Sequence, residues 1–346
     1  MNPSRILAPL SVSLLVAVLA AAPAYATSLE EALATADART AVVTAELDVN
    51  DAERQLERTE ADPAALRLDR LQARQAVALA RAELRSARYG AYLDIASAYT
   101  QVRQAAAQRG LAEDAVALAE RGLEIAQIRL ERGAGTELDV RDAETDLASA
   151  RGDLAAARQG EALARRSFAS LTDLPAEDLD AVPDALLAIE LPAPEVLEAR
   201  LDEAPTLLQA SQGLDVARVA RQLLDPAYAP ARDIDAAELR VAQAEEGLRE
   251  ARRGLELQLQ SLIDQVAAAR DRLEVARDAL SDARERDEIE RSRLDAGLIA
   301  EIAYQQTQLS TRQAELSAMQ AEHELLLAML RLQANAGVPV EGLHGF

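Results

Sequence analysis

The chain has no cysteine and no tryptophan, and only 2 of its 346 residues are phenylalanine. Without cysteine it can form neither a disulfide nor a lipidated N-terminal cysteine, so packing alone must hold the fold together. So few large side chains cannot fill a thick globular core. The abundant alanine and leucine residues are suited instead to narrow contacts between helices.

Lysine is also absent, since all 37 basic residues are arginine, and the 59 acidic residues give a net charge of −22. We do not expect such an acidic chain to bind nucleic acid. The acidic residues alternate with arginine along helical stretches instead of forming a tail. This distribution favours solvated helix faces over a charged binding patch.

Long apolar runs are confined to the N-terminus. Residues 1–26 combine a basic start at Arg5, an apolar stretch and the small-residue ending Ala24-Tyr25-Ala26. This pattern predicts a secretory signal peptide that is cleaved before Thr27. A retained membrane helix is the less favoured alternative, because the stretch is short for a span. We therefore expect an exported protein of the periplasm or of the outer-membrane-associated cell envelope, with no membrane-spanning helix in the mature chain.

Two segments of the chain resemble each other at a constant offset, which pairs Gly133 with Gly297 and Pro175 with Pro339. Such self-similarity predicts a duplicated structural unit. Proline is dense between the two copies, at a level that no helix interior tolerates. We predict a first helical hairpin repeat over residues 27–175, a Pro-rich linker over 176–194, a second repeat over 195–339 and a flexible tail over 340–346.

Within each copy, apolar residues alternate at spacings of four and three, which is the pattern of a coiled-coil seam. In the first copy only Arg109 interrupts the seam. A further apolar row lies beside it, so this helix needs two neighbours; a layer or tube of antiparallel helices and a broad seam in a compact bundle both remain open. The first seam comprises Ala91, Ile95, Ala98, Val102, Ala105, Ala112, Val116, Ala119, Leu123, Ala126 and Leu130, and the further row comprises Leu111, Leu118 and Ile125.

Glycine marks the two places where the long helices turn back. The absence of proline after Pro63 predicts an unbroken helix over residues 64–130, about 100 Å long, and a return helix over 136–170. Thr136 and Asp139 fit a capping box at the start of the return helix. The candidate docking points for a partner are the two tips, Gly133-Ala134-Gly135 and Gly297-Leu298-Ile299; packing of the apolar second tip on the neighbouring hairpin is the alternative.

No catalytic, cofactor-binding or metal-binding pattern stands out. Of the two histidines, His323 lies between Glu322 and Glu324, and the positions one turn away hold Met319 and Leu327. This context favours a solvated helix histidine over a metal ligand. We expect a protein that is not an enzyme and uses no cofactor or metal.

At its two turns the sequence resembles the TolC-like outer membrane efflux proteins. The stretch 129–140 is similar to their first periplasmic turn, 294–299 to their second, and 92–99 to the helix that leads to the first. The resemblance implies two tandem copies of a long helical hairpin, a tunnel made by a homotrimer, and docking of a periplasmic adaptor protein at the tips.

In that family each copy also carries a β-hairpin that contributes to an outer-membrane barrel. The corresponding segments here, residues 60–63 and 225–233, are too short for two membrane strands of about 9 to 11 residues each. We therefore expect an all-α fold of two tandem repeats of long antiparallel coiled-coil hairpins, equivalent to the TolC-like helical tunnel without its barrel. The expected role is export, efflux or envelope organisation, and the alternative is a structural coiled-coil spacer with no conducting role.

Overall fold

The fold is all-α, as predicted. The computed structural model describes residues 26–189 and 191–336, and within these ranges the only β pairing is an isolated parallel bridge between Thr27 and Leu179. The helices are α1 (Leu29–Leu33), α2 (Thr40–Ala61), α3 (Arg67–Glu131), α4 (Glu137–Thr172), α5 (Asp184–Leu187), α6 (Pro194–Arg200), α7 (Pro205–Gln222), α8 (Ala231–Asp295) and α9 (Glu301–Ala336), with 3-10 turns η1 (Ala34–Ala38) and η2 (Leu201–Glu203).

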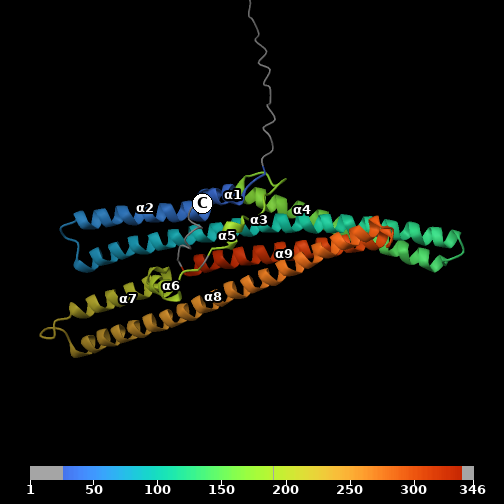
Figure 1. Cartoon of the computed structure of the whole chain (residues 1–346). Coiled ribbons are helices and arrows are strands. Elements are labelled where there is room, and N and C mark those ends of the chain that lie inside the picture. Colours follow the sequence, from blue (N-terminus) through green and yellow to red (C-terminus); the bar gives the residue numbers. More distant parts are fainter. Residues whose placement is uncertain (1–25, 190, 337–346) are drawn as a thin grey trace, which may run out of the picture.

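Two very long helices, α3 and α8, run through the molecule (Figure 1). Each contains 65 residues, which corresponds to about 100 Å, and each is followed by a return helix of 36 residues. The division into two repeats with the stated boundaries stays a prediction. The predicted signal peptide, except Ala26, and the predicted tail lie outside the described residues.

The helices form a layer instead of a compact bundle. Towards the tips, α3 lies between α4 and α9, and α9 lies next to α8; towards the opposite end, α3 contacts α2 and α7, and α7 contacts α8. The two apolar flanks of α3 thus each have a helical neighbour. Residues 62–66 join α2 directly to α3, and residues 223–230 join α7 to α8.

The neighbours of the two long helices change at the middle of the molecule, which we call the waist. There α4 ends and α2 begins, as the Arg39 side chain donates a hydrogen bond to the Leu171 carbonyl at 2.9 Å. Near the end of α9, the Asn335 side chain accepts a hydrogen bond from Gln258 of α8 at 3.0 Å, and it lines one cleft together with Thr206 at the start of α7. Only α3 and α8 extend through both halves.

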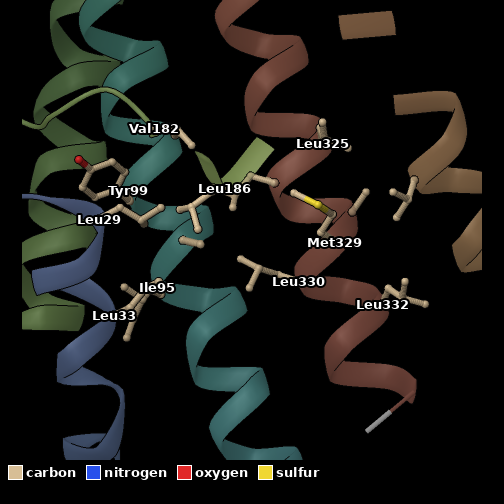
Figure 2. Close-up of a cluster of buried hydrophobic side chains, with 14 of the residues drawn as sticks. Leu29, Leu33, Ile95, Tyr99, Val182, Leu186, Leu325, Met329, Leu330 and Leu332 are labelled. Atoms are coloured by element: carbon tan, nitrogen blue, oxygen red, sulfur yellow. The ribbon is translucent and has the colours of Figure 1, made fainter. Parts of the chain in front are cut away.

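The apolar core is concentrated at the waist. Figure 2 shows side chains of α1, α3, the linker and α9 pointing towards one another there. The seam of α3 is fully buried only in this region, at Ala91, Ile95, Ala98 and Val102, and its residues nearer the tip are half-buried or exposed. The waist core includes Leu29, Leu33, Ile95, Tyr99, Val182, Leu186, Leu325, Met329, Leu330 and Leu332.

The linker takes part in this core, which the sequence did not predict. Leu186 and Leu187 of α5 are buried, and Arg277 of α8 forms an ion pair with Asp184 at 2.7 Å. The linker also carries the bridge to Thr27. As for membranes, none of the described helices combines the length and the apolar character that a transmembrane span requires.

Candidate functional site: the hairpin tips

The first tip is a tight, hydrogen-bonded turn. The Ala134 amide donates to the Arg129 carbonyl at 2.8 Å, and the Gly133 amide donates to the Leu130 carbonyl at 2.9 Å. This pair of bonds is a Schellman motif, which requires a left-handed residue after the helix, and Gly133 has a φ of 68°. The local sequence therefore determines where α3 ends.

A capping box starts the return helix α4. The Asp139 amide donates to Thr136 Oγ1 at 3.2 Å, and the Thr136 amide donates to Asp139 Oδ2 at 2.7 Å. The bonds from the backbone and hydroxyl of Thr136 lower the pKa of the Asp139 carboxyl group. Gly135 precedes the cap, and a Cβ there would lie 3.1 Å from the Arg129 Cβ, so a larger residue would crowd the turn.

The second tip uses the same turn. The Leu298 amide donates to the Arg293 carbonyl at 2.8 Å, the Gly297 amide donates to the Leu294 carbonyl at 2.8 Å, and Gly297 has a φ of 69°. The side chain of Leu298 is 70 % exposed, whereas Ile299 is half-buried. The structure therefore places one aliphatic side chain of this tip in solvent.

The two tips are staggered along the long axis. Arg121 of α3 forms an ion pair with Glu301 at the start of α9, at 3.2 Å, and Arg312 pairs with Asp114 at 3.6 Å. Since a helix rises about 1.5 Å per residue, Gly133 lies roughly 18 Å beyond Arg121. The α3–α4 hairpin therefore projects past the second tip, as Figure 1 shows.

The projecting part, residues 122–144, has exposed apolar side chains. Ile128 and Leu130 of α3 are each 37 % exposed, and Leu138 of α4 is 62 % exposed. The flank of α3 that packs against α9 lower down continues here beyond the start of α9. That the tips bind a partner stays a prediction.

The expectation of a solvated His323 is wrong. Its side chain is fully buried, and its Nε2 lies 3.2 Å from Arg103 Nη1. Burial lowers the pKa of His323 to about 3, and the charge of Arg103 acts in the same direction. The apolar residues Met319, Leu326 and Leu330 on the same helix face were a signal of burial that the adjacent glutamates obscured. The described part of the chain holds no cluster of three potential metal ligands.

The arginine that interrupts the predicted seam has a charged partner. Arg109 Nε lies 2.7 Å from the buried carboxylate of Glu161 on α4, and Arg165 approaches the same carboxylate to 2.8 Å. Arg109 also pairs with Glu113 at 3.1 Å. The interruption is therefore an ion-pair cluster between α3 and α4.

Comparison with known proteins agrees with this architecture. The family model "outer membrane efflux protein" matches residues 72–172. No curated protein matches the chain significantly.

The fold is similar to that of several solved structures. CusC, studied for conformational changes that accompany folding and transmembrane channel formation, has a TM-score of 0.66 and 16 % identity, and the match covers 89 % of this chain and 95 % of CusC. The Campylobacter jejuni outer membrane channel CmeC has a TM-score of 0.64 and 12 % identity, with 97 % and 94 % covered. The Vibrio cholerae outer membrane protein VceC has a TM-score of 0.61 and 15 % identity, with 90 % and 97 % covered. The family match within α3 and α4 and the fold across most of the chain confirm the resemblance to the TolC-like outer membrane efflux proteins.

Proposed function

We propose that this chain is an exported, non-enzymatic component of an export or efflux assembly in the cell envelope, and that it binds a periplasmic adaptor protein through its hairpin tips. The observation that carries the proposal is the projecting α3–α4 tip, which presents exposed aliphatic side chains beyond the start of α9. The match of this hairpin to the outer membrane efflux model supports it.

The geometry favours a helical partner. Up to the Arg121–Glu301 ion pair, one flank of α3 is covered by α9, and beyond it the same flank continues without a neighbour among the described residues. A partner helix placed end to end with α9 would extend the existing interface and meet Leu298. Full burial of a leucine or isoleucine side chain contributes about 1.5–3 kcal/mol, so Ile128 and Leu138 could supply much of a moderate affinity.

We further propose that copies of the chain associate side by side, as a homotrimer. The layer has two edges, formed towards the tips by α4 and α8. Leu138 and Leu163 are exposed on α4, and Leu239, Leu257, Val275 and Ile289 are exposed on α8. Packing of the α8 edge of one copy on the α4 edge of the next would cover these residues and could close a tube.

Photocrosslinking in intact cells tests tip binding. A benzophenone amino acid at Leu138 should give adducts with a helical adaptor protein, identified by mass spectrometry, and one at Leu298 should give the same adducts. The matched control is Tyr228, which is 89 % exposed at the opposite end of the molecule and should give none with that protein. Equal crosslinking at both ends, or no adduct at either tip, would contradict the proposal.

The second candidate is a structural spacer with no conducting role, which the length of α3 and α8 favours. Assembly state separates the two functions. Light scattering of the purified mature protein should give the mass of a trimer for the tube. A monomer that crosslinks to no adaptor at its tips would favour the spacer.

A further inference from the structure

Thr27 occupies a closed site at the waist. It is 3 % exposed, and its amide donates to the Asp178 carbonyl at 2.9 Å. Its own carbonyl accepts from the Asp180 amide at 3.2 Å and from the Tyr99 hydroxyl at 3.1 Å. Its side-chain hydroxyl donates to the Pro175 carbonyl at 3.1 Å.

These contacts join three segments that are distant in sequence. Tyr99 of α3 also reaches the Asp180 carbonyl, at 2.8 Å, and its ring packs edge-on against Phe168 of α4 at a centroid distance of 6.0 Å. Thr27 is thus held by α3 and by the linker between the predicted repeats. Each of its polar backbone groups has a partner within the fold.

The peptide bond between Ala26 and Thr27 is the predicted signal-peptide cleavage site, and a protease needs such a bond in an accessible, extended segment. In the folded chain, the amide of this bond belongs to Thr27 and is already bonded to Asp178. Cleavage would require the Thr27 contacts to open first, and such opening is rare in a well-packed region.

We propose that the chain is cleaved between Ala26 and Thr27 before the waist folds, and that the new α-ammonium group of Thr27 then becomes part of the waist. The inference rests on the proposed export. A signal peptidase breaks the C–N bond with water: the hydroxyl goes to the Ala26 carbonyl carbon, and a proton goes to the Thr27 nitrogen. The resulting ammonium keeps the hydrogen bond to the Asp178 carbonyl and makes it charge-assisted.

The order of the two events can be measured with the full-length precursor. Precursor made without signal peptidase is purified folded, and one half is unfolded in urea at a concentration that the peptidase tolerates. We expect purified signal peptidase to cleave the folded half at least tenfold more slowly, as followed by intact mass. Equal rates for the folded and unfolded halves would overturn the inference.

Tyr99→Phe provides a specific check, since it removes only the hydroxyl that donates to Thr27 and Asp180. It should raise the ratio of folded to unfolded cleavage rates several-fold. Tyr92→Phe on the same helix is the matched control, because the Tyr92 hydroxyl makes no hydrogen bond within the described part of the chain. If Tyr99→Phe does not fold, as judged by circular dichroism, Thr27→Val removes the hydroxyl bond to Pro175 and should raise the same ratio; an unchanged ratio overturns the inference.

The mature N-terminus gives an independent answer. Protein recovered from the envelope should begin at Thr27, and any other N-terminus would overturn the inference. Tip binding is judged separately, by crosslinks from Leu138 in the mature chain, so failure of one proposal is distinguishable from failure of the other.

Discussion

Arg103 Nη1 lies 3.2 Å from His323 Nε2, and this contact joins α3 to α9. Because the guanidinium group can only donate, Nε2 must accept, which requires a neutral imidazole with its proton on Nδ1. Nδ1 is buried and has no hydrogen-bond partner among the described residues. The contact between the two long hairpins therefore depends on an uncharged histidine.

The first prediction concerns acid stability. The pKa of His323 is near 6.5 in the unfolded chain and about 3 in the folded one, so between these values the unfolded chain binds the proton more tightly. The stability that depends on neutral His323 is complete above pH 6.5 and is lost as the pH falls towards 3, by at most about 1.4 kcal/mol per pH unit. Urea unfolding of the wild type and of His323→Gln between pH 8 and 4 checks this, and parallel curves would contradict it.

The second prediction concerns the Arg109–Glu161 pair. Glu161 is buried while Arg109 is 36 % exposed, so solvent weakens the attraction, and we expect Arg109→Ala to cost about 1–2 kcal/mol. The double variant Arg109→Leu/Glu161→Leu should be close to the wild type, because it leaves neither charge buried alone. Arg151→Ala, which breaks an exposed pair with Glu120, is the control and should change the urea midpoint little.

The third prediction concerns the glycines at the turns. Gly133→Ala and Gly297→Ala should each destabilise by about 1–2 kcal/mol, because an alanine is forced to a positive φ. Gly110→Ala lies within α3, where a Cβ meets open space in the described structure, and should stabilise by up to about 1 kcal/mol. Thermal unfolding followed by circular dichroism measures all three; the same sign for Gly110 and Gly133 would rule out this account.

The fourth prediction concerns the waist core. Leu326 is fully buried, and Leu326→Ala should cost about 2–5 kcal/mol. Leu257 is 74 % exposed on α8, so Leu257→Ala should have an effect within about 0.5 kcal/mol. Comparable losses in the two variants would show that the core does not lie where the structure places it.

The long helices and their ends could be predicted because their signals are local. The seam indicated α3, and Gly133 followed by Thr136 and Asp139 indicated where it ends and where α4 begins. The bounds of both helices lie within one turn of the predicted ones. Short-range hydrogen bonds determine such ends, and they depend on residues that are adjacent in the sequence.

The waist could not be predicted, because it depends on contacts between distant segments. Nothing next to His323 in the sequence points to Arg103, and nothing in the proline-rich linker indicates that Thr27 pairs with Leu179. The stagger of the tips is likewise set by how α9 lies along α3, as the Arg121–Glu301 pair shows. Periodicity determines which face of a helix is covered but not the axial position of its neighbour.

The change of neighbours at the waist has a mechanical consequence. Because α4 ends where α2 begins, and α9 ends near the start of α7, a torque applied at the tips can pass to the far end only along α3 and α8 and through the packed linker. Each half is a stiff plate of four helices, and the joint between them is where the molecule bends most easily. A partner that grips the tips would thus turn one plate against the other about the waist.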